Sequence, residues 1–284
     1  MKKTIILGAS GQLGNCIARV AEERKLNNIM FPAESESDIL SPDALRVLFE
    51  KENPAYVVNC AAYTAVDRAE EDVDKARMIN KTGAANIAEI CRDLKITMIH
   101  VSTDFVFQGN QTKLLNELDP TTPINIYGIT KLEGEQVIQE ILPEHFIIRT
   151  AWLYSEFGNN FVKTMQRLGR ERDELGVIVD QVGTPTYGVD LAGIILDFIS
   201  SESKAFGIYH YSNEGAVSWY DFAQAIFELS NIQVTVKAVR TDEYVTKAVR
   251  PSWSVMDKTK IRKVLGTSVP YWRDSLKRCI EAIQ

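Results

Sequence analysis

The stretch Thr4-Ile5-Ile6-Leu7-Gly8-Ala9-Ser10-Gly11-Gln12-Leu13-Gly14 carries the strongest indication of the fold. Its first four residues are β-branched or apolar, as in a fully buried parallel strand, and an amphipathic helix pattern follows Gly14. Between strand and helix, Gly8 permits a tight turn, Gly11 lets the backbone approach a pyrophosphate, and Gly14 lets the helix pack closely. The stretch therefore predicts a dinucleotide site at a helix N-terminus, against the alternative of an ordinary glycine-rich turn.

Composition and charge limit the classes of protein to be considered. With 284 residues and a 45% hydrophobic share, the chain can form one large domain or two modest ones. A net charge of −6 gives no electrostatic footprint for nucleic acid. No apolar run approaches the ~20 residues of a membrane span, and the first residues do not have the pattern of a signal peptide. We expect a cytoplasmic protein with neither nucleic acid nor a membrane as partner.

The four cysteines are far apart and lack metal-binding spacing, so we expect buried thiols in a reducing compartment. Three histidines, His100, His145 and His210, stand alone at strand edges, and we expect them to be structural. No cluster of histidine, cysteine and aspartate predicts a metal site.

Strand and helix patterns alternate up to about residue 150. Buried strands are expected at residues 28–31, 55–60, 96–101 and 146–149, and helices at residues 42–52, at 69–94, and around Lys131 to Leu142. Repeated β–α units with short strands predict an α/β fold, a Rossmann doubly wound parallel sheet with helices on both faces.

The second half of the chain is less regular. Residues 158–161 are expected to lead into a helix that ends at about residue 170. Further helices are expected at residues 189–200, 219–229 (capped by Ser218) and 271–283, and strands at residues 176–179, 208–211 and 234–239. We expect residues 1–150 to form the dinucleotide-binding domain, with its sheet extended by residues 174–210. Residues 151–173 and 211–284 are expected to form a smaller C-terminal substrate-binding lobe.

Candidate site residues follow several of the predicted strands. Gly11 follows the first, Ala61-Ala62-Tyr63-Thr64 a middle one, and Ser102-Thr103-Asp104 a later one. Ligands of doubly wound sheets bind at the carboxyl ends of the strands, so these three segments are predicted to converge. No acidic residue or arginine clearly ends the second strand, at residues 28–31, and the preference between NADPH and NADH stays open.

The segment Tyr127-Gly128-Ile129-Thr130-Lys131 places a phenol and an amine on one helix face. An ammonium beside a phenol favours the phenolate, so we expect Lys131 to lower the pKa of Tyr127. A hydroxyl from the end of a preceding strand would then hold a carbonyl or carbinol in line with the phenol.

The glycine turn and the YxxxK pair together resemble the extended short-chain dehydrogenase/reductases. A closer resemblance, to the dTDP-4-dehydrorhamnose reductase family, extends over nearly the full length. It is carried by the segments at residues 11–14, 61–67, 102–107, 149–152, 158–161, 180–186 and 250–251.

This resemblance implies a reaction in dTDP-rhamnose biosynthesis. Hydride from NADPH or NADH reduces the 4-keto group of a dTDP-linked 4-keto-6-deoxysugar, converting dTDP-4-dehydro-L-rhamnose to dTDP-L-rhamnose. By similarity, Tyr127 is the general acid, Lys131 lowers its pKa and holds the nicotinamide ribose, and Thr103 hydrogen-bonds the substrate oxygen. Gly8, Gly11, Gln12, Leu13 and Gly14 would hold the cofactor, together with Asp38, Ile39, Ala62, Tyr63 and Thr64.

The resemblance also implies substrate contacts from Asp104, Trp152, Asn160 and Arg250, the last through a planar fork that suits a diphosphate. Three of the implied contacts have structural alternatives. Asp104 would fix its loop, Asp38 would form an Asx turn, and Trp152 would be a core residue.

Some family members hold magnesium at a dimer contact through glutamates near the first helix, where this chain has Asn15 and Cys16. We therefore expect no required metal, and a homodimer stays open. The alternative functions are another nucleotide-sugar reductase or epimerase of the same fold, or a non-catalytic NADP-binding regulatory subunit. An intact Thr103, Tyr127 and Lys131 disfavours the regulatory subunit.

Overall fold

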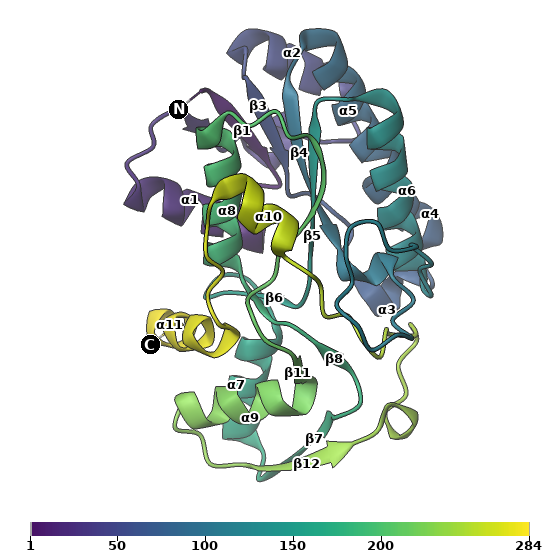
Figure 1. The fold of residues 1–284 in the computed structure, drawn as a ribbon, viewed down its shortest axis with the longest axis vertical. Helices are drawn as coiled ribbons and strands as arrows, with labels where there is room; N and C mark the ends of the chain where they lie inside the picture. Colours follow the sequence, from purple (N-terminus) through teal and green to yellow (C-terminus); the bar gives the residue numbers. More distant parts are fainter. Residues whose placement is uncertain (1, 284) are drawn as a thin grey trace.

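The structure is a computed structural model that describes residues 2–283. A six-stranded sheet forms one half of the molecule (Figure 1), and every neighbouring pair of its strands is parallel. Its order is β2 (Ile29–Met30), β1 (Thr4–Leu7), β3 (Tyr56–Asn59), β4 (Thr97–Thr103), β5 (His145–Thr150) and β10 (Gly207–His210). The order reverses between β1 and β3, where doubly wound folds bind their ligands. The predicted α/β class is confirmed.

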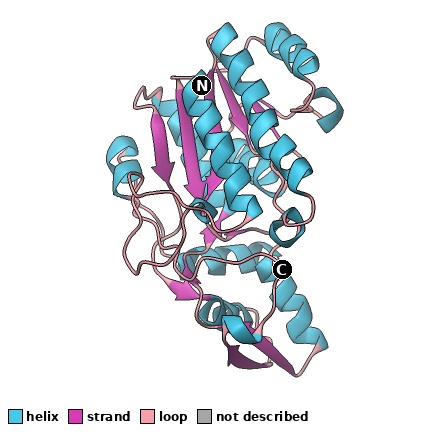
Figure 2. Cartoon of the chain, turned by 90° about the vertical axis from the view of Figure 1, so that its right-hand side faces the viewer, coloured by secondary structure: helices cyan, strands magenta, loops and turns pink. Residues whose placement is uncertain are grey.

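Helices cover both faces of this sheet (Figure 2). Successive strand residues point to opposite faces, so Ile6 belongs to one core cluster and Ile5 to the other. The first face is covered by α1 (Gln12–Glu23), α8 (Gly188–Ser201) and α10 (Thr259–Leu265). The second is covered by α2 (Pro42–Glu52), α5 (Gly83–Leu94) and α6 (Ile126–Ile141). No helix in the described part of the chain is long and apolar enough to cross a membrane.

The helix expected at residues 69–94 is interrupted. The chain forms α3 (Val66–Ala69), then α4 (Val73–Arg77), a π-helical turn (Met78–Thr82) and α5. The π turn buries the side chain of Asn80, which binds the backbone N–H and C=O of Tyr63 and the hydroxyl of Thr130. These contacts are non-local, and periodicity does not reveal them. The small residues of α5 pack against the sheet and α6.

The smaller half contains a separate core around Phe222 and Tyr187. It is built from β6 (Leu153–Tyr154), α7 (Phe161–Glu171), β7 (Glu174–Ile178), β8 (Val182–Gly183), β9 (Thr186–Tyr187), β11 (Val217–Ser218), α9 (Trp219–Leu229), β12 (Thr235–Val239) and α11 (Trp272–Ile283). The Ser218 cap of α9 is confirmed, because its hydroxyl accepts from the N–H of Asp221.

Residues 174–210 were expected to extend the central sheet, and the structure confirms this only in part. Within this segment only β10 joins the central sheet, beside β5, and α8 covers one face. By contrast, β7 pairs in parallel with β12 in the smaller half. The reason is burial: β7 alternates exposed and buried residues, as a strand covered on one side does, whereas β5 is buried throughout.

A buried ion pair fixes α6 to the sheet. Arg149 of β5 binds Glu135 of α6 through two nitrogens, with Nη2 2.6 Å from Oε2, and both side chains are at most 3% exposed. Ser102 of β4 also donates a hydrogen bond to Glu135 at 2.5 Å. Buried charges are tolerated when each is paired in this way. The pair therefore sets the position of α6 over the carboxyl ends of β4 and β5.

We expect Glu135→Gln to lower the free energy of unfolding by about 3–5 kcal/mol, because Arg149 would keep a buried charge without its partner. Glu133→Gln is the matched control on the same helix. Glu133 pairs with Arg77 at a partly exposed position, where a loss of about 0–1 kcal/mol is expected. Urea unfolding of both variants measures the difference, and equal losses would contradict the structural role of the buried pair.

Candidate active site

A cavity of about 810 Å³ lies at the carboxyl ends of the strands, between the sheet and the smaller half. Fifteen of the predicted site residues line it: Gly8, Gly11, Gln12, Leu13, Asp38, Ile39, Ala62, Thr64, Thr103, Asp104, Tyr127, Lys131, Trp152, Asn160 and Arg250. Two do not, Gly14 and Tyr63. The predicted convergence of separate segments at one sheet edge is therefore found in the structure.

The turn between β1 and α1 has the close packing that its glycines predict. Gly8 has a φ of +73°, and a Cβ there would lie 2.6 Å from the Ala61 nitrogen. A Cβ on Gly14 would collide with the Ala9 carbonyl oxygen. Gly14 therefore lets α1 pack closely against the glycine turn, although it does not itself line the cavity. Gly11 is the N-cap of α1 and offers no side-chain cap, and no acidic residue stands in the first turn. The N–H groups and dipole of this helix start suit a pyrophosphate.

Tyr63 does not contribute a side chain to the cavity. Its hydroxyl donates to Asp72 at 2.9 Å, and its backbone is held by Asn80. Asp38 accepts from the N–H of Leu40 at 2.9 Å and also lines the cavity, so the Asx turn and the predicted site position occur together.

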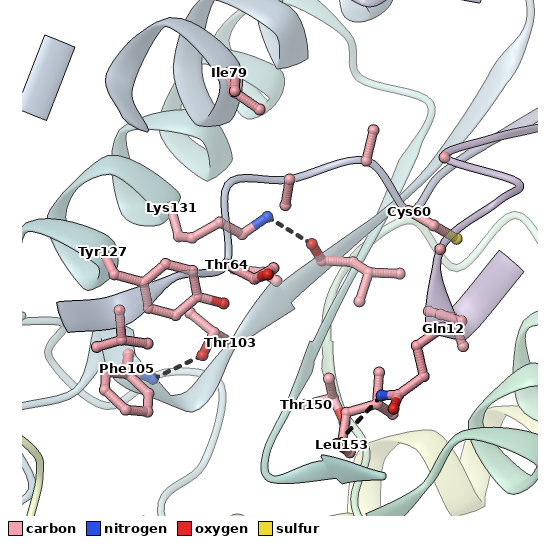
Figure 3. A pocket seen from close by; sticks show the side chains of 18 of the residues that line it. Gln12, Cys60, Thr64, Ile79, Thr103, Phe105, Tyr127, Lys131, Thr150 and Leu153 are labelled. Carbon is pink, nitrogen blue, oxygen red and sulfur yellow. Dashed lines mark hydrogen bonds between the residues drawn. The ribbon is translucent and has the colours of Figure 1, made fainter. Parts of the chain in front are cut away.

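Thr103, Tyr127 and Lys131 face the same part of the cavity (Figure 3). Thr103 ends β4, and its hydroxyl accepts from the N–H of Phe105 at 3.2 Å. Tyr127 lies in the first turn of α6, with its ring edge-on to Phe105. Lys131 follows one turn later, and its Nζ donates to the Val101 carbonyl at 2.7 Å. The helix and the strand thus present an amine, a phenol and a hydroxyl to one space.

The expected effect of Lys131 on the pKa of Tyr127 is not observed. Burial raises the pKa of Tyr127 to about 12, and the neighbouring Thr103 hydroxyl lowers it only in part. The Nζ of Lys131 is hydrogen-bonded to β4, and it does not contribute to the shift at the phenol. The loss of solvation therefore exceeds the attraction that the four-residue spacing suggested.

Asp104 is a buried carboxyl group at the cavity wall. Its side chain is 2% exposed, Oδ1 accepts from the Thr103 hydroxyl at 3.1 Å, and Oδ2 has no hydrogen-bond partner among the described residues. Burial raises the pKa of Asp104 to about 6, although hydrogen bonds from Ser254 and Thr103 oppose the shift. A carboxyl group with a free, buried oxygen can accept or donate a hydrogen bond at a ligand.

The smaller half supplies the remaining predicted residues. Trp152 adopts a φ of +46° and stacks on Trp219 with ring centroids 3.5 Å apart. Asn160 caps α7 through the N–H of Lys163 and donates to Gln12 across the cavity at 2.9 Å. These contacts join the glycine turn to the second lobe.

Comparison with known proteins identifies the family. The sequence model described as "RmlD substrate binding domain" matches residues 1–284. A dTDP-4-dehydrorhamnose reductase of Aggregatibacter actinomycetemcomitans is 39% identical over 288 residues, which cover 98% of each chain. The chain belongs to the dTDP-4-dehydrorhamnose reductase family. The predicted family is confirmed, and the chain is accordingly an enzyme of the oxidoreductase class.

Two solved structures of this family superpose over almost the whole chain. A dTDP-4-dehydrorhamnose reductase from Clostridium acetobutylicum has a TM-score of 0.95 and 41% identity, covering 99% of both chains. One from Bacillus anthracis, solved in complex with NADP, has a TM-score of 0.94 and 38% identity, with the same coverage. The Rossmann fold and an NAD(P) cofactor are therefore properties of the family.

Arg250 has a partner that sequence reasoning missed. Its Nη2 lies 2.5 Å from Oδ2 of Asp67, which follows β3 and was quoted only as part of a family segment. Asp67 also accepts from the N–H of Ala248, so the 248–250 loop is attached to α3. Asp67 and Arg250 are 183 positions apart, so no local pattern could predict this contact. Both residues stand in segments that carry the family resemblance, and that was the only indication in the sequence that they matter.

The cavity wall after β2 carries a carboxylate that the sequence analysis did not assign. Glu34 lies in a short 3-10 helix (Glu34–Glu36) and lines the cavity together with Asp38. An acidic residue soon after the second strand of a Rossmann fold is placed to meet the ribose of a dinucleotide. Glu34 is visible in the sequence, but β2 ends at Met30 and a turn separates the two. For this reason the sequence did not identify Glu34 as the acidic residue that follows the second strand. No group of three or more metal-binding side chains occurs in residues 2–283.

Asp104 gives the folded protein a specific pH dependence. Its carboxyl pKa is about 6 in the folded chain, above its ordinary value of 3.8, so the fold binds this proton more tightly than the unfolded chain does. The resulting stability is fully present below the ordinary value and is lost as the pH rises through 6. We expect Asp104 to reduce the free energy of unfolding by about 2 kcal/mol between about pH 4 and pH 7.

Denaturant unfolding of the wild type and of Asp104→Asn at several pH values measures this contribution. The amide cannot ionise, so the variant should lack that part of the decline while other titrating groups contribute equally to both proteins. Parallel pH profiles for the two proteins would show that Asp104 does not bind its proton as the structure indicates.

Proposed function

We propose that this chain reduces the 4-keto group of a dTDP-linked 4-keto-6-deoxysugar, dTDP-4-dehydro-L-rhamnose to dTDP-L-rhamnose, with NADPH or NADH, and that Tyr127 is the general acid. One observation carries the proposal: the side chains of Thr103, Tyr127 and Lys131 share one cavity with the glycine turn. The relatives named above support the substrate class, since they are dTDP-4-dehydrorhamnose reductases.

The residues at the glycine turn fit a dinucleotide. The cradle formed by Gly8 and Gly11 has no side chains, and any Cβ on Gly8 would displace the backbone of Ala61. Gly11 and Gln12 at the start of α1 would hold the pyrophosphate, and Asp38 and Ile39 would contact the adenosine end. When bound, the reduced nicotinamide supplies the hydride, and the protein supplies orientation and exclusion of water.

Tyr127 can serve as the proton donor because its phenol is protonated at neutral pH. A phenol whose pKa is about 12 keeps its proton at neutral pH. The alkoxide that hydride transfer forms at C4 is a stronger base than the phenolate, so transfer of the proton from Tyr127 to this oxygen is favourable. Thr103 stands beside the phenol. By turning its hydroxyl proton away from Asp104 Oδ1, it would donate a second hydrogen bond to the same oxygen, where negative charge develops.

Lys131 and the smaller lobe would hold the two ligands. Lys131 is 2% exposed and reaches the cavity from α6, where its amine would bind ribose hydroxyls. Trp152, Asn160 and Arg250 line the cavity on the lobe side, and Asp104 lies beside Thr103. The fork of Arg250 suits the diphosphate of the sugar nucleotide, in exchange for part of its contact with Asp67.

We expect Tyr127→Phe to lower kcat by about 10²–10⁴-fold, the range for loss of a general acid, with cofactor affinity little changed. The substitution keeps the ring and its contact with Phe105. Loss of absorbance at the nicotinamide band with a dTDP-4-keto-sugar as substrate measures the rate, and fluorescence titration measures cofactor binding.

Tyr63→Phe is the matched control. It also removes a phenol hydroxyl, but that hydroxyl binds Asp72 and does not line the cavity. The control should keep nearly the full rate. An unchanged rate in Tyr127→Phe, or equal losses in both variants, would remove Tyr127 from the reaction.

A further inference from the structure

A row of three buried side chains connects the central sheet to the proposed catalytic helix. Asn59 ends β3, His100 lies in β4 and Lys131 lies in α6, and each is 1–2% exposed. The Asn59 amide nitrogen is 3.1 Å from His100 Nδ1, and His100 Nε2 is 3.1 Å from Lys131 Nζ. The imidazole therefore lies between an amide and an amine and has little contact with solvent.

The orientation of the Asn59 amide is set by the backbone. The N–H of Ala61 donates to Asn59 Oδ1 at 3.0 Å, so the oxygen is occupied and the amide nitrogen faces His100 Nδ1. An amide nitrogen only donates, and Nδ1 must accept. Burial holds the pKa of His100 well below its ordinary value, and the imidazole is neutral. A neutral imidazole has one proton, which this network assigns to Nε2.

The assigned proton points at Lys131. An ammonium group has three donors and no acceptor, so a charged Lys131 would put two donors face to face across the 3.1 Å contact. An uncharged amine can accept from Nε2–H and still donate to the Val101 carbonyl. Moving the imidazole proton to Nδ1 only transfers the conflict to Asn59 and Ala61. All three contacts are satisfied when Lys131 is an amine.

We propose that His100 is a positioning residue that stabilises the uncharged amine of Lys131 by donating its Nε2–H to Nζ. The inference deepens the proposed function, on which it rests, because it says how the chain controls the charge that Lys131 offers to the nicotinamide ribose. His100 touches neither ligand and acts only through Lys131.

The other groups around Lys131 act on the same equilibrium. Burial lowers the pKa of Lys131 to about 8, whereas Glu135 on its own helix and Cys60 after β3 oppose the shift. The influence of Glu135 is limited because Arg149 is paired with it, and Tyr127 is uncharged at neutral pH. A lysine with a pKa of about 8 changes its charge within the pH range in which enzymes work. One hydrogen bond to its amine is then enough to shift the pH at which half of it is protonated.

The experiment titrates Lys131 directly in the full chain. Brief acylation with trace acetic anhydride, from about pH 6 to about pH 10, labels lysines only as free amines, and mass spectrometry reads the Lys131 peptide. His100→Gln places a carbonyl oxygen near Nζ that can accept from an ammonium. We expect the labelling midpoint of Lys131 to rise by about one pH unit or more, a tenfold change in proton affinity.

His145→Gln is the matched control, because His145 is a buried histidine in β5 whose hydrogen bond goes to the Leu142 carbonyl. It should leave the Lys131 midpoint unchanged. Asn59→Asp is a second variant that keeps the imidazole. A carboxylate accepts from Nδ1–H, frees Nε2 to accept from an ammonium, and should also raise the midpoint.

An unchanged Lys131 midpoint in folded His100→Gln or Asn59→Asp overturns the inference and leaves the Tyr127→Phe test of the proposed function untouched. The pH profile of kcat/KM separates the two proposals further. If the Lys131 midpoint and the high-pH limit of the kcat/KM profile both move to higher pH, the role of His100 and the proposed contribution of Lys131 both stand. If the midpoint rises while the alkaline limb stays in place, the role of His100 stands and the proposed contribution of Lys131 to the reaction fails.

Discussion

The docking of α6 on β4 is the constraint on which the rest of the site depends. Lys131 reaches the Val101 carbonyl from this helix, and one turn later Glu135 binds Ser102 and Arg149. These polar contacts are buried, so they hold only one register of helix against strand. That register brings Tyr127 beside the residue that ends β4. Apolar packing alone tolerates small shifts, which the geometry of proton transfer does not.

Burial gives these groups their chemistry as well as their position. The same loss of solvation raises the pKa of Tyr127, raises that of Asp104 and lowers that of Lys131. Each group is thereby shifted toward its uncharged form. The cavity thus holds a phenol that keeps its proton, beside a carboxyl and an amine that change charge near neutral pH. Such shifted groups gathered in one cavity are typical of an active site.

Local patterns in the sequence were sufficient for the sheet, its helices and the convergence of the glycine turn with Thr103, Tyr127 and Lys131. They succeeded because strand periodicity and the rule for carboxyl ends need no knowledge of distant contacts. They failed where distant residues decide. Arg250 pairs with Asp67, which is far away in the sequence. The π turn is stabilised by the contacts that Asn80 makes with Tyr63 and Thr130. The strand β7 pairs with β12 and not with the central sheet. The predicted lowering of the Tyr127 pKa was wrong for the same reason, because spacing along a helix does not show how deeply a side chain is buried.

The most direct test of the account follows the hydride itself. The full chain is mixed with nicotinamide cofactor deuterated at C4 of the ring and with a dTDP-linked 4-keto-6-deoxysugar, and the product is analysed by NMR. The account predicts deuterium at C4 of the sugar from one face of the ring, with one stereochemistry at the new carbinol. Cofactor bound in the cavity without any label in the sugar would contradict it.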